Sequence, residues 1–266
     1  MADQEQHAWL FRDTGRSRGR TRVVDRSNSG LEFLRYGRIV LEGDRITLST
    51  GDEEIVLLCL NGSGDVRSGG AGHTLGKYDA IYLPRDSECA VSSSGFFDLA
   101  EIAAPVTGRY PLQVVRFADV VRDPDMAKDA GFVPYARKLH TIVGEKNTQA
   151  GRLLAGVTFS QDGNWTSWPP HDHADVKEEI YLYVDMPAPN FALHLNYTDF
   201  HDMEMVVPVR EGDAVAIKRG YHYNVATPGT QVGFVWMMAA IREGVDRAFS
   251  TVTVQPEFSG DRFKLF

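Results

Sequence analysis

Short apolar segments, each closed by a turn signal, follow one another along most of the chain and leave little room for helices. Residues 54–60 are almost continuously apolar and end at Asn61-Gly62, a dipeptide typical of tight turns. Similar segments recur at spacings of about ten residues, which favours an all-β sandwich or barrel. The other expected strands cover residues 78–83, 96–103, 152–159, 179–183, 192–197, 203–209, 213–217 and 231–239.

The strand pattern is interrupted between residues 109 and 138, where three prolines occur. This stretch is typical of a connector between two β units, and a short helical piece is expected within residues 117–130. A turn leading into an apolar strand occurs at residues 76–81 and again at 212–217, once in each half of the chain. Together these features predict a duplicated β-barrel.

Composition excludes several classes of protein. Hydrophobic residues make up 43% and charged residues 24%, as in ordinary globular proteins. The net charge of −8 argues against a general binder of nucleic acid or anionic membranes, because such binders need a basic face. The longest apolar run falls well short of the roughly 20 residues of a membrane span, and the acidic start does not resemble a signal peptide. We therefore expect a cytoplasmic protein, with Cys59 and Cys89 as buried free thiols.

Three of the eight histidines form a pattern with metal-binding chemistry. His171 and His173 are two residues apart, so their side chains share one face of an extended strand. A glutamate on the next strand and His222 on a third strand could complete a set that faces the inside of a barrel. Imidazole nitrogens with one carboxylate suit a divalent transition-metal ion. Glu179 is the preferred carboxylate because it directly precedes an alternating strand, which leaves Glu178 as a supporting or solvated group.

Three motifs resemble one known family. They are residues 163–173 (GNWTSWPPHDH), residues 178–181 (EEIY) and residues 220–222 (GYH). Together they resemble the 5-deoxy-glucuronate isomerase family of myo-inositol catabolism, a bicupin family related to 5-keto-4-deoxyuronate isomerase. Residues 50–56 and 60–66 are similar to its N-terminal barrel, so the resemblance spans about the whole chain.

The resemblance implies an all-β bicupin with two jelly-roll β-barrels. We place an N-terminal arm at residues 1–30, a metal-free barrel at 31–115 and a connector at 116–140. The metal-binding barrel and a C-terminal tail then occupy residues 141–266. The resemblance also implies that the second barrel holds a metal ion, and we expect zinc, with manganese or iron as other possibilities. The implied ligands are His171, His173, Glu179 and His222.

The implied reaction is the isomerisation of 5-deoxy-glucuronate to 5-dehydro-2-deoxy-gluconate. Moving a carbonyl between C1 and C2 needs a Lewis acid and a group that carries a proton. The candidate proton carriers are Glu178, Tyr181 and Tyr221, with Tyr183 and Tyr223 as further possibilities. A cation must also bind the substrate carboxylate, for which Arg137 and Lys218 are preferred over Arg219 and Arg242. Trp168 could stack on the sugar, as could Trp165.

Two other functions use the same residues. Iron held by three histidines and one glutamate could activate oxygen in a cupin dioxygenase. Alternatively, the metal could hold a ligand in a non-catalytic sugar-binding cupin. The expected partner is a small sugar acid, and a homo-oligomer is expected from the exposed barrel edges and apolar strands.

Overall fold

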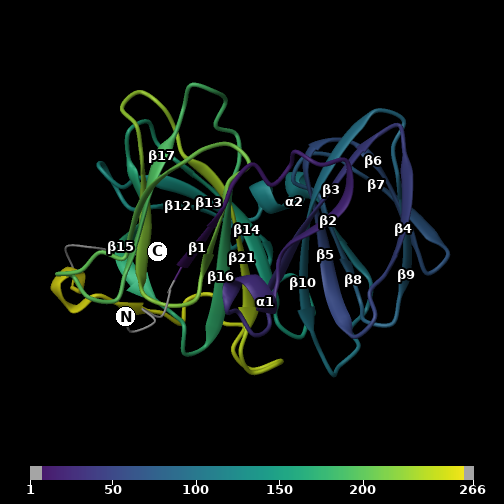
Figure 1. Ribbon diagram of the computed structural model, residues 1–266. Coiled ribbons are helices and arrows are strands. Elements are labelled where there is room, and N and C mark those ends of the chain that lie inside the picture. Colours follow the sequence, from purple (N-terminus) through teal and green to yellow (C-terminus); the bar gives the residue numbers. More distant parts are fainter. Residues whose placement is uncertain (1–7, 261–266) are drawn as a thin grey trace.

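The computed structural model describes residues 8–260 as two antiparallel β units that lie side by side (Figure 1). The first unit comprises β2 (Gly19–Val24), β3 (Arg35–Glu42), β4 (Arg45–Ser49), β5 (Glu53–Gly62), β6 (Gly64–Ser68), β7 (Ala71–Leu75), β8 (Ala80–Leu83), β9 (Glu88–Ser92), β10 (Phe96–Pro105) and β11 (Gln113–Val115). These strands form a six-stranded sheet in the order β11-β8-β5-β10-β3-β2 and a four-stranded sheet in the order β4-β9-β6-β7.

The second unit likewise consists of two antiparallel sheets, but it has more strands. It comprises β1 (Ala8–Phe11), β12 (Ala127–Ala130), β13 (Arg137–Val143), β14 (Leu153–Ser160), β15 (Trp165–Asp172), β16 (Lys177–Tyr183), β17 (Ala192–Tyr197), β18 (Met205–Val209), β19 (Ala214–Ile217), β20 (Tyr221–Ala226), β21 (Gly233–Ala240) and β22 (Thr253–Val254). One sheet has the order β1-β19-β16-β21-β14-β13-β12, and the facing sheet has the order β18-β17-β20-β15-β22.

Helices are short: α1 (Arg26–Ser29), α2 (Phe117–Arg122) and the 3₁₀ turn η1 (Pro256–Phe258). The described residues contain no helix long and apolar enough to cross a bilayer. The predicted all-β fold of two jelly-roll units is confirmed, and each expected strand overlaps an observed one. Cys59 and Cys89 are buried and free, as predicted. Burial raises the pKa of the Cys59 thiol to about 12.

The three largest apolar clusters hold the molecule together. One fills the space between the sheets of the first unit and includes Ile55 and Leu57. A second fills the second unit and includes Tyr181 and Trp236. The third lies between the two units. It combines Val56, Leu58, Ala100 and Ile102 of the first unit with Ile180, Leu182, Val235 and Met237 of the second. Four central strands, β5, β10, β16 and β21, are apolar on both faces. Because side chains alternate in direction along a strand, each of these strands contributes residues to two of the clusters.

Two buried glutamates fasten the units to each other. The carboxylate of Glu54 on β5 accepts hydrogen bonds from the backbone N–H groups of Gly151, Arg152 and Leu153, at 2.6–2.9 Å. The carboxylate of Glu178 on β16 accepts the backbone N–H groups of residues 32, 33 and 34, at 2.6–2.9 Å. Each glutamate therefore binds the other unit through three charge-assisted hydrogen bonds.

Over its described residues 8–30 the predicted arm forms β1, β2 and α1, and residues 1–7 lie outside the described part. Strand β1 pairs with β19 of the second unit, whereas β2 pairs with β3 of the first. Two arginines of β2 form ion pairs with the first unit: Arg20 binds Glu101 at 2.6 Å and Arg22 binds Glu53 at 2.9 Å. The predicted connector likewise contains β12 and the start of β13, both in the sheet of the second unit. The domain boundaries themselves stay a prediction.

Candidate metal centre and its cavity

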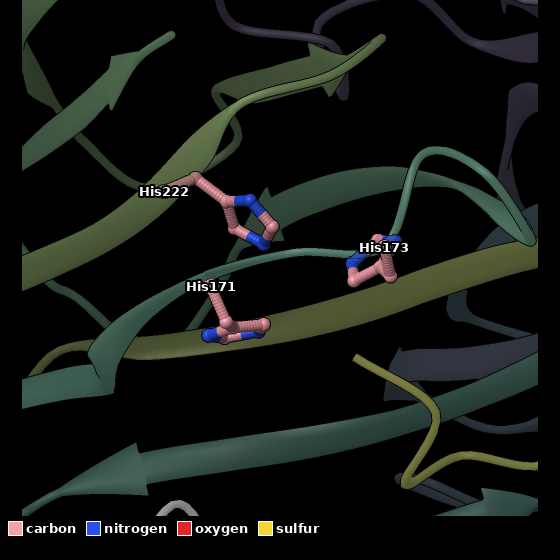
Figure 2. A group of neighbouring side chains, drawn as sticks. All are labelled: His171, His173 and His222. Atoms are coloured by element: carbon pink, nitrogen blue, oxygen red, sulfur yellow. The ribbon is translucent and has the colours of Figure 1, made fainter. Parts of the chain in front are cut away.

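Three histidines converge between the two sheets of the second unit (Figure 2). His171 lies near the end of β15, directly opposite His222 on the neighbouring strand β20, and His173 follows in the turn after β15. The pairing of β15 with β20 contains a register shift between Thr166 and His171. The candidate ligand atoms of the three histidines all lie within 4.8 Å of one another, and all three rings are buried.

The backbone orients each ring. Nδ1 of His171 is 3.0 Å from the carbonyl oxygen of Pro169, and Nδ1 of His222 is 2.9 Å from that of Gly220. Nδ1 of His173 is 3.1 Å from the carbonyl oxygen of Lys177. A carbonyl can only accept, so each Nδ1 carries the hydrogen when the ring is neutral. Each Nε2 is then left with a lone pair, which is the arrangement that metal-bound histidines use.

Glu179 completes the cluster from β16. Its Oε2 lies 3.0 Å from Nε2 of His173 and 2.9 Å from Nε2 of His222, and its Oε1 is buried without a hydrogen-bond partner among the described residues. Burial alone would raise the pKa of this carboxyl, but the two histidines outweigh it and lower the pKa to about 2. When the rings are neutral with hydrogen on Nδ1, three imidazole lone pairs and a carboxylate face one another, and either protons on Nε2 of His173 and His222 or a cation can bridge them. Such a donor set fits a divalent cation.

A narrow cavity opens beside this cluster, and the positively charged side chain of Arg137 is buried in its wall. His171, Glu179, Tyr181 and Arg137 all line it. Arg137 is 5% exposed, and burial lowers its pKa to about 10, so it stays charged at neutral pH. Tyr181 donates to or accepts from the hydroxyl of Ser167 at 2.9 Å. Burial and the charge of Glu179 hold the pKa of Tyr181 well above its usual value, so its phenol stays protonated.

A strap near the C-terminus, residues 247–252, covers one side of the cavity. Phe249 and Val252 of this strap line the cavity, and the next residues form β22 against His171 and Asp172. The strap is held by Lys177, whose buried Nζ donates to the carbonyl oxygens of Ala248 and Thr251 at 2.8 Å each.

Four of the predicted site residues lie elsewhere. The carboxylate of Glu178 is used between the units, on the opposite face of β16 from Glu179. Trp168 packs against Trp165, Tyr223 and Phe258 on the outer face of the five-stranded sheet. Tyr221 lines a neighbouring depression together with His173 but not the cavity. Lys218 follows β19 and lies near Gly30.

The further proton-carrier candidates, Tyr183 and Tyr223, also lie away from the cavity. Tyr183 is buried deeper in the second unit, where its hydroxyl lies 2.7 Å from Nδ1 of His194. Tyr223 belongs to the outer aromatic cluster. The structure thus brings together His171, His173, Glu179, His222, Tyr181 and Arg137.

Sequence reasoning missed several residues that line the cavity, notably Thr158, Thr166, Ser167 and Trp236. Thr158 and Trp236 belong to strands predicted from their apolar character, so the alternation of those strands could have assigned their faces. Thr166 and Ser167 could not be found in that way, because the register shift in β15 breaks the alternation.

This chain is similar to proteins of one known family. A family model described as the KduI/IolB family matches residues 9–253, which is most of the chain. The chain belongs to the KduI/IolB family. A relative from Geobacillus thermodenitrificans, named 5-deoxy-glucuronate isomerase, is 26% identical over 234 residues, which are 81% of this chain and 83% of the relative.

Solved structures agree with this KduI/IolB assignment at the level of the fold. An IolB-like protein from Salmonella typhimurium LT2 has a TM-score of 0.82 at 23% identity, covering 94% of this chain and 97% of that one. A cupin 2 conserved barrel domain protein from Leptotrichia buccalis has a TM-score of 0.52 at 12% identity, covering 83% and 88%. The two β units are therefore of the cupin type.

Proposed function

We propose that this KduI/IolB protein is a metal-dependent aldose–ketose isomerase that converts 5-deoxy-glucuronate to 5-dehydro-2-deoxy-gluconate. The observation that carries the proposal is one cavity lined by His171 and Glu179 of the candidate metal cluster and by the guanidinium of Arg137. The name of the Geobacillus relative supports the substrate and the reaction. The expected homo-oligomeric state stays a prediction.

His171, His173, Glu179 and His222 would hold the ion. Zinc suits this nitrogen and oxygen donor set best, and manganese or iron are alternatives. When bound, a divalent ion supplies Lewis-acid chemistry at the carbonyl and hydroxyl oxygens of a substrate. Arg137 would bind the carboxylate at the other end of the sugar acid, because a guanidinium matches a carboxylate with two parallel hydrogen bonds.

Among the three predicted proton carriers, Tyr181 is the one that lines the cavity. We propose that its Oη donates a proton to a substrate oxygen, with the Ser167 hydroxyl holding the phenol in place. We expect Tyr181→Phe to lower kcat at least about tenfold, within the usual contribution of general acid catalysis, and to leave the metal content unchanged. Steady-state kinetics and elemental analysis of the same preparation measure both. An unchanged kcat would remove Tyr181 from the mechanism.

Elemental analysis of the purified protein tests the metal site directly. We expect about one equivalent of zinc, manganese or iron per chain, and its loss in His171→Ala. His201→Ala is the matched control, because His201 is an exposed histidine outside the cluster. A metal-free wild type with an unchanged His171→Ala variant would contradict the proposal. Isomerase activity on 5-deoxy-glucuronate without oxygen consumption would separate the isomerase from a dioxygenase.

A further inference from the structure

We infer that Trp236 and Thr166 bind the hydroxyl groups of the substrate and so determine specificity for a polyhydroxy acid. Both residues line the cavity, and each has a buried polar atom without a hydrogen-bond partner among the described residues: Nε1 of Trp236 and Oγ1 of Thr166. The inference rests on the proposed function and adds to it two contacts with hydroxyl groups of the sugar chain.

The indole of Trp236 is firmly positioned. It lies over Gly156 of the neighbouring strand β14, where even a Cβ atom would collide with the ring. Phe249 of the strap packs on the indole with ring centroids 4.7 Å apart. The residue is 2% exposed. The N–H group is thus held without freedom to turn toward water.

Thr166 approaches from the opposite sheet. It is fully buried on β15, and the next residue, Ser167, has a φ of 56° and directs its hydroxyl to Tyr181. A non-glycine residue in this left-handed region is strained, and such strain is concentrated at functional sites. The two facing walls of the cavity therefore each contribute an unsatisfied polar atom, in addition to Oε1 of Glu179.

Strand register places Trp236 between the two ends of the proposed substrate. On β21, Met238 pairs with Glu179, Trp236 pairs with Tyr181 and Phe234 pairs with Thr158 of β14. Arg137 is one further row along, opposite Ser160. Rows two residues apart are separated by roughly 7 Å. A substrate that reaches from Glu179 toward Arg137 therefore passes Trp236, which lies one row from Glu179 and two rows from Arg137.

The chemistry of the two atoms points to hydroxyl groups. An indole N–H can only donate, whereas a threonine hydroxyl both donates and accepts. A sugar hydroxyl can satisfy either one. Buried polar atoms without partners are rare in folded proteins, so a pair of them in one cavity indicates a polar ligand. The lining also includes the apolar side chains of Leu139, Phe234 and Met238, which cannot satisfy either atom.

The test compares Thr166→Val, Trp236→Phe and the double variant with two matched controls. Thr148→Val changes a buried threonine outside the cavity, and Trp165→Phe changes an indole of the outer aromatic cluster. We expect each cavity variant to raise the KM for 5-deoxy-glucuronate about three- to tenfold, the usual effect of one lost hydrogen bond. Both controls should stay within about twofold of wild type, and all variants should keep the wild-type metal content.

Calorimetric titration with two six-carbon acids separates hydroxyl binding from general damage. D-gluconate carries hydroxyl groups and hexanoate carries none. We expect the wild type to prefer D-gluconate, and the double variant to lose that preference while its affinity for hexanoate stays the same. An equal loss of affinity for both acids, or an unchanged preference for D-gluconate in the double variant, would overturn the inference. If the wild type turns over no substrate but still shows the hydroxyl preference, the isomerase proposal alone fails.

Discussion

The three clustered histidines each commit Nδ1 to a backbone carbonyl oxygen, and this shared feature defines the chemistry of the site. An imidazole held in this way cannot turn Nε2 away from the centre, so the ligand set exists before any ion binds. Glu178 and Glu179 show how strongly position decides role. These adjacent, identical side chains point to opposite faces of β16, one toward the other unit and one toward the histidines.

A fourth buried histidine predicts how stability depends on pH. Burial, with a smaller effect of His222, lowers the pKa of His194 to about 3, against 6.5 for an unperturbed histidine. Below pH 6.5 His194 is protonated in the unfolded chain but stays neutral in the folded protein, so the free energy of unfolding falls as the pH falls. Between pH 6.5 and 5 this group alone accounts for about 2 kcal/mol.

Urea unfolding of the metal-free protein at several pH values between 5 and 8 measures this effect. We expect His194→Gln to lose less stability than wild type on going from pH 7 to pH 5, because its side chain does not titrate. His201→Gln, at an exposed position, is the control and should follow the wild type. Parallel pH curves for wild type and His194→Gln would show that His194 does not refuse the proton.

At the scale of elements, β16 connects the site to the rest of the molecule through three consecutive residues. Lys177 holds the strap, Glu178 binds the first unit and Glu179 faces the histidines. We expect Glu178→Gln to lower the free energy of unfolding by about 3 kcal/mol, since an amide cannot accept all three backbone N–H groups. Glu53→Gln is the matched control. Its ion pairs with Arg22 and Arg35 are partly exposed, so about 1 kcal/mol or less is expected. Equal losses in urea unfolding would contradict this role.

The strap gives a second prediction at this scale. Lys177→Met removes both hydrogen bonds to the carbonyl oxygens of Ala248 and Thr251 while keeping most of the buried side-chain volume. We expect amide hydrogen exchange in residues 248–252 to become at least about tenfold faster, because local opening no longer breaks these bonds. Lys138→Met, at an exposed ion pair with Asp129, should leave the exchange of this strap unchanged. Unaltered exchange in Lys177→Met would show that apolar packing alone holds the strap.

For the whole molecule, the two units are related by their strand register. Glu179 pairs with Ile217 on β19, and the corresponding pair in the first unit is Ile55 with Leu83 on β8. By the same register Glu178 corresponds to Glu54. The fastening glutamates are therefore present twice, whereas the position of Glu179 is occupied by an isoleucine in the first unit. This difference supports the prediction that the first barrel holds no metal.

The shared core predicts that the halves depend on each other. A chain of residues 116–266 lacks β1 and exposes the apolar faces of β16 and β21 that pack against the first unit. We expect this half to be aggregated or unfolded when expressed alone, and to become soluble when co-expressed with residues 1–115. Light scattering and circular dichroism measure both states. A soluble, folded half that binds metal by itself would show that each unit is an independent domain.

The sequence by itself determined the all-β class, most of the strands and the histidine–glutamate set, because these follow from side-chain alternation and local spacing. Alternation assigns a residue to a face of its strand, but it does not say which element covers that face. The tertiary structure therefore decided that Glu178 fastens the two units and that Trp168 packs on the outer surface. It also decided that residues 8–30 supply one strand to each unit. The position of Thr166 in the cavity could not be predicted for a related reason. The register shift in β15 arises in its pairing with β20, a strand more than fifty residues away in the sequence.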